Sequence, residues 1–77
     1  MSVRDRFYSK ALRRLRNQDS ATVLAWAQTS LWGLQAGLEG YQANRDEAAL
    51  DEALRGALGL LAAVEVLLDK ERGSTAH

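Results

Sequence analysis

The 77-residue sequence contains no cysteine and no proline, and residues that favour strands are few. Without cysteine, neither disulfide bonds nor thiolate metal sites can stabilise the fold. Much of the chain consists of alanine, leucine, glutamate, glutamine and arginine, which lose little conformational entropy in a helix. A chain of this length has room for one domain with one modest core. The composition therefore predicts a single all-α domain, and it makes self-association the natural source of further stability.

Residue types suited to catalysis are also scarce. His77 is the only histidine and stands at the C-terminal end, where it cannot serve a serine as partner base. Glu47 and Asp51 lie one helical turn apart, but a carboxylate metal site in a helical bundle needs histidines and further inward-facing carboxylates. Glu65 interrupts an apolar run and is expected at a solvated rim. We therefore expect a protein that is not an enzyme and that uses no cofactor, no metal and no small-molecule substrate.

The spacing of apolar residues predicts three helices. The first covers residues 3–16, has Ser2 as its N-terminal cap, and carries an apolar stripe at intervals of four: Val3, Phe7, Ala11 and Leu15. The second follows a cap at Asp19 or Ser20 and runs to about Tyr41. Its apolar seam alternates steps of three and four: Leu24, Ala27, Leu31, Leu34, Leu38 and Tyr41.

The third helix is expected to start at a cap formed by Asn44 and to end at Gly73. It carries a wide apolar face: Leu50, Ala53, Leu54, Ala57, Leu60, Leu61, Val64, Leu67 and Leu68. A short polar turn between two long helices predicts an antiparallel hairpin, on which the short basic first helix packs. Residues 1–72 then form one three-helix domain, and residues 73–77 form a disordered C-terminal tail.

The register of the hairpin follows from a turn centred near Ala43 and Asn44. Large residues then face small ones, which fills a core without voids: Leu38 with Ala49, Leu34 with Ala53, Leu31 with Gly56 or Ala57, and Ala27 with Leu60. Each glycine within a helix costs roughly 0.8 to 1 kcal/mol relative to alanine, and the chain has five: Gly33, Gly37, Gly40, Gly56 and Gly59. These glycines indicate close approach of helix backbones, or else a second helix that kinks or ends near Gly40.

A second stripe beside the main seam of each long helix is predicted to lack a cover, because the first helix has too few apolar residues to cover both. Its members are Trp26, Ser30, Gly33, Leu58, Ala62 and Val66. An uncovered stripe usually marks an interface, and soluble oligomers favour closed symmetry. We therefore predict a homodimer in which two hairpins form a helical bundle. The expected function is that of a small protein–protein interaction module, a self-associating adaptor or a regulator that docks on a larger protein.

Charge is distributed unevenly, although the net charge is zero. Residues 1–18 contain six basic residues and one acidic residue. A basic end of this kind attracts nucleic acid, a membrane surface or the acidic remainder of the same molecule. The alternative function is therefore a nucleic-acid-binding regulator, with phosphate contacts from Arg6, Lys10, Arg13 and Arg14.

Association with a membrane is a second alternative. No charged residue occurs from Ser20 to Leu38, a pattern typical of a membrane span, but Gln28 and Gln35 make the segment only mildly apolar. An amphipathic helix that does not enter a membrane is the favoured interpretation. The N-terminus also lacks the basic stub and apolar run of a secretory signal, so a cytoplasmic location is expected.

Overall fold

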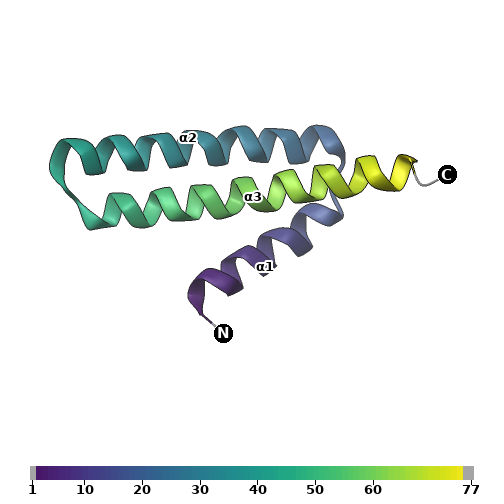
Figure 1. Ribbon diagram of the computed structural model, residues 1–77, viewed down its shortest axis with the longest axis horizontal. Coiled ribbons are helices and arrows are strands. Elements are labelled where there is room, and N and C mark those ends of the chain that lie inside the picture. The colour runs from purple at the N-terminus through teal and green to yellow at the C-terminus, as the bar shows by residue number, and fades with distance from the viewer. Residues whose placement is uncertain (1, 76–77) are drawn as a thin grey trace.

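The computed structural model describes residues 2–75, which form three helices. They are α1 (Val3–Arg16), α2 (Ser20–Asn44) and α3 (Glu47–Thr75). Helices α2 and α3 pack against each other as a long antiparallel hairpin, and α1 packs against α3 (Figure 1). The predicted all-α fold, in which a short basic helix packs on a long antiparallel helical hairpin, is confirmed.

Side chains cap the first two helices at positions that the sequence indicated. The Ser2 hydroxyl accepts a hydrogen bond from the Asp5 backbone N–H at 3.2 Å, and the Asp19 carboxylate accepts one from the Thr22 N–H at 3.0 Å. Hydrogen bonds from the side chain and backbone of Thr22 lower the pKa of Asp19. Each cap satisfies an N–H group that has no partner within its own helix, and so sets where α1 and α2 begin.

The turn between α2 and α3 differs from the expectation. Asn44, predicted to cap the third helix, is instead the last residue of α2. Arg45 reverses the chain in the left-handed conformation (φ 54°, ψ 33°), and its N–H donates to the Tyr41 carbonyl at 2.7 Å. Its guanidinium lies 5.4 Å from the centre of the Tyr41 ring, a cation–π contact that offsets part of the cost of a positive φ. Asp46 then supplies the cap of α3, accepting a hydrogen bond from the Ala48 N–H at 3.0 Å.

Two glycines that could end helices lie within them. Helix α2 continues through Gly40 to Asn44, so the alternative of a second helix that ends near this glycine is wrong. Helix α3 continues through Gly73 to Thr75, beyond its expected end. No glycine in the described range has a positive φ, so ordinary helical backbone passes through both positions. Residues 76 and 77 of the predicted disordered tail lie outside the described residues.

Small residues form the contact between α2 and α3. A Cβ atom at Gly37 would lie 2.5 Å from the Ala49 carbonyl oxygen and 2.6 Å from the Ala53 amide nitrogen. At Gly56, a Cβ atom would lie 2.6 Å from the amide nitrogen of Leu34. Only the hydrogen of glycine fits such gaps, so the two backbones approach closely. The buried and half-buried seam consists of Val23, Ala27, Ser30, Leu34, Gly37 and Tyr41 on α2 and of Ala49, Ala53, Gly56, Leu60, Ala63 and Leu67 on α3.

The predicted large-against-small register is wrong at Leu38, and Leu31 does not face Gly56. Leu38, predicted to face Ala49, is 51% exposed, and Gly37 lies against Ala49 in its place. Leu31, predicted to face Gly56 or Ala57, is 39% exposed, and Gly56 packs against Ser30 and Leu34. The helices pack through glycine, alanine and serine because these residues let two backbones come closer than leucines would. The leucines one position further along the chain are thereby turned to the outside.

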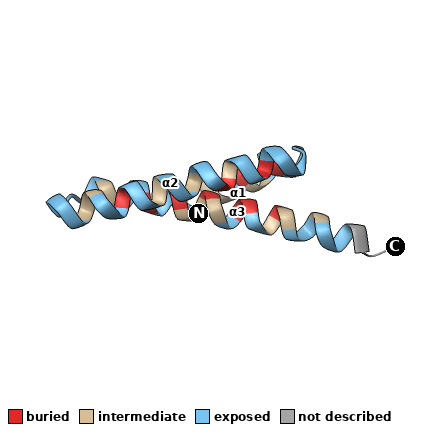
Figure 2. Cartoon of the chain, turned by 90° about the horizontal axis from the view of Figure 1, so that it is seen from above, coloured by how far each residue is buried: buried red, intermediate tan, exposed pale blue. Residues whose placement is uncertain are grey.

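All three helices meet in a core toward the end of the hairpin away from the turn, which we call the open end. Figure 2 shows that buried residues follow the contacts between the helices and that much of the remaining surface is exposed. The core residues are Ala11 and Leu15 of α1, Val23 and Ala27 of α2, and Ala62, Ala63 and Val66 of α3. Most of these side chains are small, so the intrachain core is modest.

Candidate protein-binding surface

Two residues of the predicted interface are buried inside the chain. Ala62 and Val66 are 0% and 2% exposed and belong to the core. The expectation that this stripe of α3 lacks a cover is therefore wrong at both positions. Helix α1 is short, but it places Ala11 and Leu15 directly over this part of α3, where little apolar area is needed to bury an alanine and a valine.

The other four residues of the predicted interface lie in or beside contacts within the chain. A Cβ atom at Gly59 would lie 2.7 Å from the Ser30 Oγ and 3.2 Å from the Trp26 Nε1. Gly33 is half-buried, with no atom within 4 Å of its Cβ position, and Leu58 is half-buried in a hollow beside α1. The predicted residues therefore do not form one open apolar stripe.

The exposed apolar side chains belong mostly to the leucines that the periodicity assigned to the interior of the hairpin. On α2 they recur every seven residues: Leu24, Leu31 and Leu38. On α3 they alternate steps of four and three, with the half-buried Ala57 completing the row: Leu50, Leu54, Leu61, Val64 and Leu68. These eight side chains are between 38% and 52% exposed. The sequence pattern identified the residues but not the surface on which they lie.

Both rows lie on the same broad side of the hairpin. Every member of either row comes one residue after a seam residue, as Leu38 follows Gly37 and Leu50 follows Ala49. An antiparallel pair of helices is related by a two-fold axis perpendicular to the plane of the pair, so equivalent positions on the two helices face the same side. We call this surface the leucine face; its members are Leu24, Leu31, Leu38, Leu50, Leu54, Leu61, Val64 and Leu68.

The leucine face has a polar border but no charged residue within it. Gln28, Gln35 and Gln42 are exposed and follow its α2 edge at intervals of seven residues. No charged residue occurs between Leu24 and Leu38 of α2, and those of α3 fall outside the row that runs from Leu50 to Leu68. Docking an apolar surface here would therefore bury no side-chain charge.

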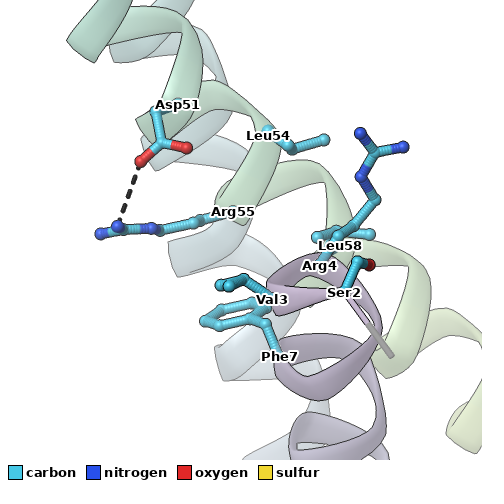
Figure 3. A pocket seen from close by; sticks show the side chains of 8 residues that line it. All are labelled: Ser2, Val3, Arg4, Phe7, Asp51, Leu54, Arg55 and Leu58. Atoms are coloured by element: carbon cyan, nitrogen blue, oxygen red, sulfur yellow. Dashed lines mark ion pairs between the residues drawn. The ribbon is translucent and has the colours of Figure 1, made fainter.

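A hollow of about 300 Å³ extends the leucine face toward the N-terminus of α1 (Figure 3). Val3 and Phe7 of α1 and Leu54 of α3 give it apolar walls, and Val3 is 81% exposed. An ion pair between Arg55 and Asp51, with an N–O distance of 3.1 Å, lies at its edge. Because Leu54 belongs to both, the apolar surface is continuous from α2 across α3 to α1.

A polar contact ties α1 to α3 beside the core. Glu65, expected at a solvated rim, is half-buried, and its carboxylate accepts a hydrogen bond from the Tyr8 hydroxyl. This hydrogen bond raises the pKa of Tyr8, and desolvation together with the negative charge of Glu65 adds to the effect. No spacing signal links Tyr8 to Glu65 in the sequence, because the contact depends on how α1 docks.

The basic residues of the nucleic-acid alternative, Arg6, Lys10, Arg13 and Arg14, are all exposed on α1. Arg6, Lys10 and Arg13 follow one another at steps of four and three, so they share one side of the helix. This side is turned away from the buried Ala11, and none of the four residues forms an ion pair within residues 2–75. These charges are therefore accessible on the surface of α1.

Among residues 2–75, no group of three or more histidine, cysteine, aspartate or glutamate side chains is placed to hold a metal ion. In the same range, no helix combines the length and the apolar character needed to cross a membrane. His77 lies outside the described residues.

No protein-family model matches this chain, and neither a curated protein nor a solved structure matches it.

Proposed function

We propose that this protein is a helical protein–protein interaction module that binds its partner through the leucine face and that it is not an enzyme. The proposal is supported by one observation above all: eight large aliphatic side chains, each 38–52% exposed, lie together on two helices with no charged residue among them. Soluble proteins rarely leave a contiguous surface of this kind open unless it serves binding. Each Å² of apolar surface that a partner covers contributes roughly 25 cal/mol.

The spacing of the leucine face favours a helical partner. Steps of four and three along α3, and of seven along α2, are the spacing at which side chains of one helix insert between those of another. A partner helix with its own apolar stripe would pack on this surface in the way that an amphipathic helix lays its apolar face into a hydrophobic groove. The expected role is that of an adaptor or a regulator, with self-association as its simplest form.

The modest core gives a physical reason for association. The largest fully buried side chains are Leu15, Val23 and Val66, and the rest of the core consists of alanines. A chain with so small a core gains stability from any partner that binds only the folded state, because binding shifts the folding equilibrium by mass action. Covering the leucine face would supply the large buried side chains that the isolated chain lacks.

Nucleic-acid binding is the second candidate, and the exposed row of Arg6, Lys10 and Arg13 favours it. Such a row can neutralise successive phosphates without reading base sequence. Attachment of the leucine face to a lipid surface is a third candidate, in which the same apolar side chains would enter the interfacial region of a membrane. A cytoplasmic location stays a prediction under the first two candidates.

Site-specific photocrosslinking in living cells tests the proposal. A photoreactive amino acid replaces Leu61 at the centre of the leucine face, and in a control variant it replaces Trp32. Trp32 is 68% exposed on the side of α2 away from α3, where its neighbours Thr29 and Ala36 are also exposed. We expect protein adducts of discrete mass from position 61 and none, or far fewer, from position 32.

The adducts distinguish the candidates. Equal yields from the two positions, or lipid adducts from position 61, would contradict binding of a protein by the leucine face. An adduct of twice the chain mass indicates self-association, whereas a heavier discrete adduct indicates a different protein partner.

A further inference from the structure

We propose that the partner of the leucine face is a second copy of this chain, docked antiparallel about a two-fold axis so that α3 packs on α3 and α2 on α2. This inference rests on the proposed function, because it names the partner of the same surface. In this arrangement the turn of each hairpin lies beside the open end of the other. The product is a four-helix core in which every neighbouring pair of helices is antiparallel, as in known up-down bundles.

The row of apolar residues on α3 reads the same in both directions. From Leu50 to Leu68 its steps are four, three, four, three and four. Two such rows laid antiparallel bring each member opposite another apolar residue, including one small residue opposite a large one. The pairs across the interface are Leu50 with Leu68, Leu54 with Val64, and Ala57 with Leu61.

The row on α2 is symmetric as well. Leu24 and Leu38 each lie seven residues from Leu31. When two copies of α2 pack antiparallel, Leu24 meets Leu38 of the second copy and Leu31 meets its own counterpart. The two-fold axis therefore passes close to Leu31.

The centres of the two rows lie within one helical turn of each other along the hairpin, so a single axis passes near both. The centre of the α3 row falls between Ala57 and Leu61, and that of the α2 row is Leu31. Gly56 packs against Ser30 and Leu34, which puts Leu31 near the level of Ala57, about two residues or about 3 Å along the helix from the centre of the α3 row. Because this offset is smaller than one helical turn, an axis placed between the two levels keeps the members of both rows opposite apolar partners, and the leucine face is complementary to itself.

A parallel dimer lacks this match. Rotation about the long axis would place α3 of one copy on α2 of the other, so that the dense row on α3 would meet only Leu24, Leu31 and Leu38. Gln28 and Gln35 flank that sparse row and would face leucines, which costs the hydration of their amides. The antiparallel arrangement leaves these amides at the edge of the interface.

The distribution of charge favours the same orientation. Residues 39–52, around the turn, contain five acidic residues and one basic residue, whereas residues 10–19 contain four basic residues and one acidic residue. Phe7 shares a hollow with Leu58 and Leu15 shares the core with Val66, so α1 runs parallel to α3 and its basic C-terminal half lies at the open end. Antiparallel docking brings this basic end beside the acidic turn of the second copy. Exposed charges contribute little affinity, but they select between orientations.

The area of the leucine face meets the lower bound for a specific dimer. Helix α3 rises about 27 Å from Leu50 to Leu68, and two packed helices present a strip about 20 Å wide. Docking two such faces buries on the order of 1,000 Å² in total, where specific interfaces begin. Val3 and Phe7 at the edge of the face add to this area. An interface of this size predicts a dimer that dissociates reversibly.

Single cysteines in the naturally cysteine-free chain test the arrangement. The variants are Leu31→Cys, Leu50→Cys, Leu68→Cys and Leu38→Cys, with Trp32→Cys as the exposed control outside the face. Each is treated with a short bifunctional maleimide, alone and in pairwise mixtures, after circular dichroism confirms its helicity. Light scattering first establishes the mass of the wild-type protein. If a variant loses helicity, Leu54→Cys and Val64→Cys form a second pair with the same prediction.

The antiparallel dimer predicts that Leu31→Cys crosslinks to itself and that the mixture of Leu50→Cys and Leu68→Cys gives a mixed dimer as its main product. Trp32→Cys should give no dimer. Crosslinking of Leu50→Cys to Leu38→Cys, or of Leu50→Cys to itself, would overturn the orientation and leave the proposed function intact. A monomeric wild type without crosslinks from Leu31→Cys would overturn the second copy as partner. Photocrosslinking of Leu61 to another protein would in that case still support the proposed function.

Discussion

The hydroxyl of Tyr8 in α1 donates a hydrogen bond to the carboxylate of Glu65 in α3, 57 positions away in the sequence. Both side chains are half-buried. The contact stands at the edge of the core that α1 completes by placing Ala11 and Leu15 on α3. It therefore serves as a local probe of whether α1 is docked.

Replacing Tyr8 with phenylalanine should lower the melting temperature modestly and should change how stability depends on pH. The hydrogen bond raises the pKa of Tyr8 above its ordinary value of 10.0, so the folded state holds the phenolic proton more tightly than the unfolded state does. The contribution to stability is therefore fully present below pH 10 and is lost as pH rises through the folded-state pKa. Urea unfolding of wild type and Tyr8→Phe from pH 7 to 11 measures this difference. A gap between the two proteins that stays constant up to pH 11 would contradict the contact.

Alanine substitutions at three glycines should have opposite effects on stability. Gly37→Ala and Gly56→Ala place a Cβ atom 2.5 to 2.7 Å from backbone atoms of the opposite helix, so each should destabilise by about 1 to 3 kcal/mol. Gly33→Ala is the matched control, because nothing lies within 4 Å of its Cβ position, and it should stabilise by up to about 1 kcal/mol through helix propensity. Chemical denaturation at one fixed protein concentration gives all three values. Stabilisation at all three glycines would show that the helices do not pack through this seam.

The nucleic-acid candidate makes its own prediction. If Arg13 and Arg14 contact phosphates, affinity for duplex or single-stranded nucleic acid falls steeply with salt, and changing both arginines to glutamine flattens that slope. Fluorescence anisotropy with labelled oligonucleotides between 50 and 200 mM salt, the range in which phosphate contacts cost most, measures the slope. Absence of micromolar binding by the wild type at low salt would remove this candidate.

Local signals in the sequence were sufficient to locate the helices. The bounds of α1, Val3–Arg16, agree with the prediction. The Ser2 cap indicates where the helix begins, and apolar residues recur at intervals of four along it. The turn was less predictable, since an arginine adopts the left-handed conformation at position 45, where glycine or asparagine would have been the usual signal. Gly37, Gly56 and Gly59 do mark close packing, whereas Gly33 does not.

The sequence could not show which apolar stripe lies inside. Helix α2 carries two adjacent stripes, one of mixed small residues that includes Ser30 and Gly37, and one of leucines that includes Leu31 and Leu38. Area alone favours burying the leucines, and on this basis the sequence predicts that they form the seam. Two helices that meet through small residues bring their backbones closer and gain van der Waals contacts. This gain depends on the small residues of both helices, so the pattern of one helix alone does not reveal it. The buried positions of Ala62 and Val66 likewise depend on the docking of α1, which no local spacing encodes.

The mass of the protein in solution shows whether two copies associate through the leucine face. At micromolar concentration, light scattering after size exclusion should give twice the chain mass of 8.5 kDa for the wild type and for Trp32→Glu. Leu61→Glu, which places a charge at the centre of the leucine face, should give 8.5 kDa while keeping its helicity. A monomeric wild type, or a Leu61→Glu protein that remains dimeric with unchanged affinity, would contradict self-association through this face.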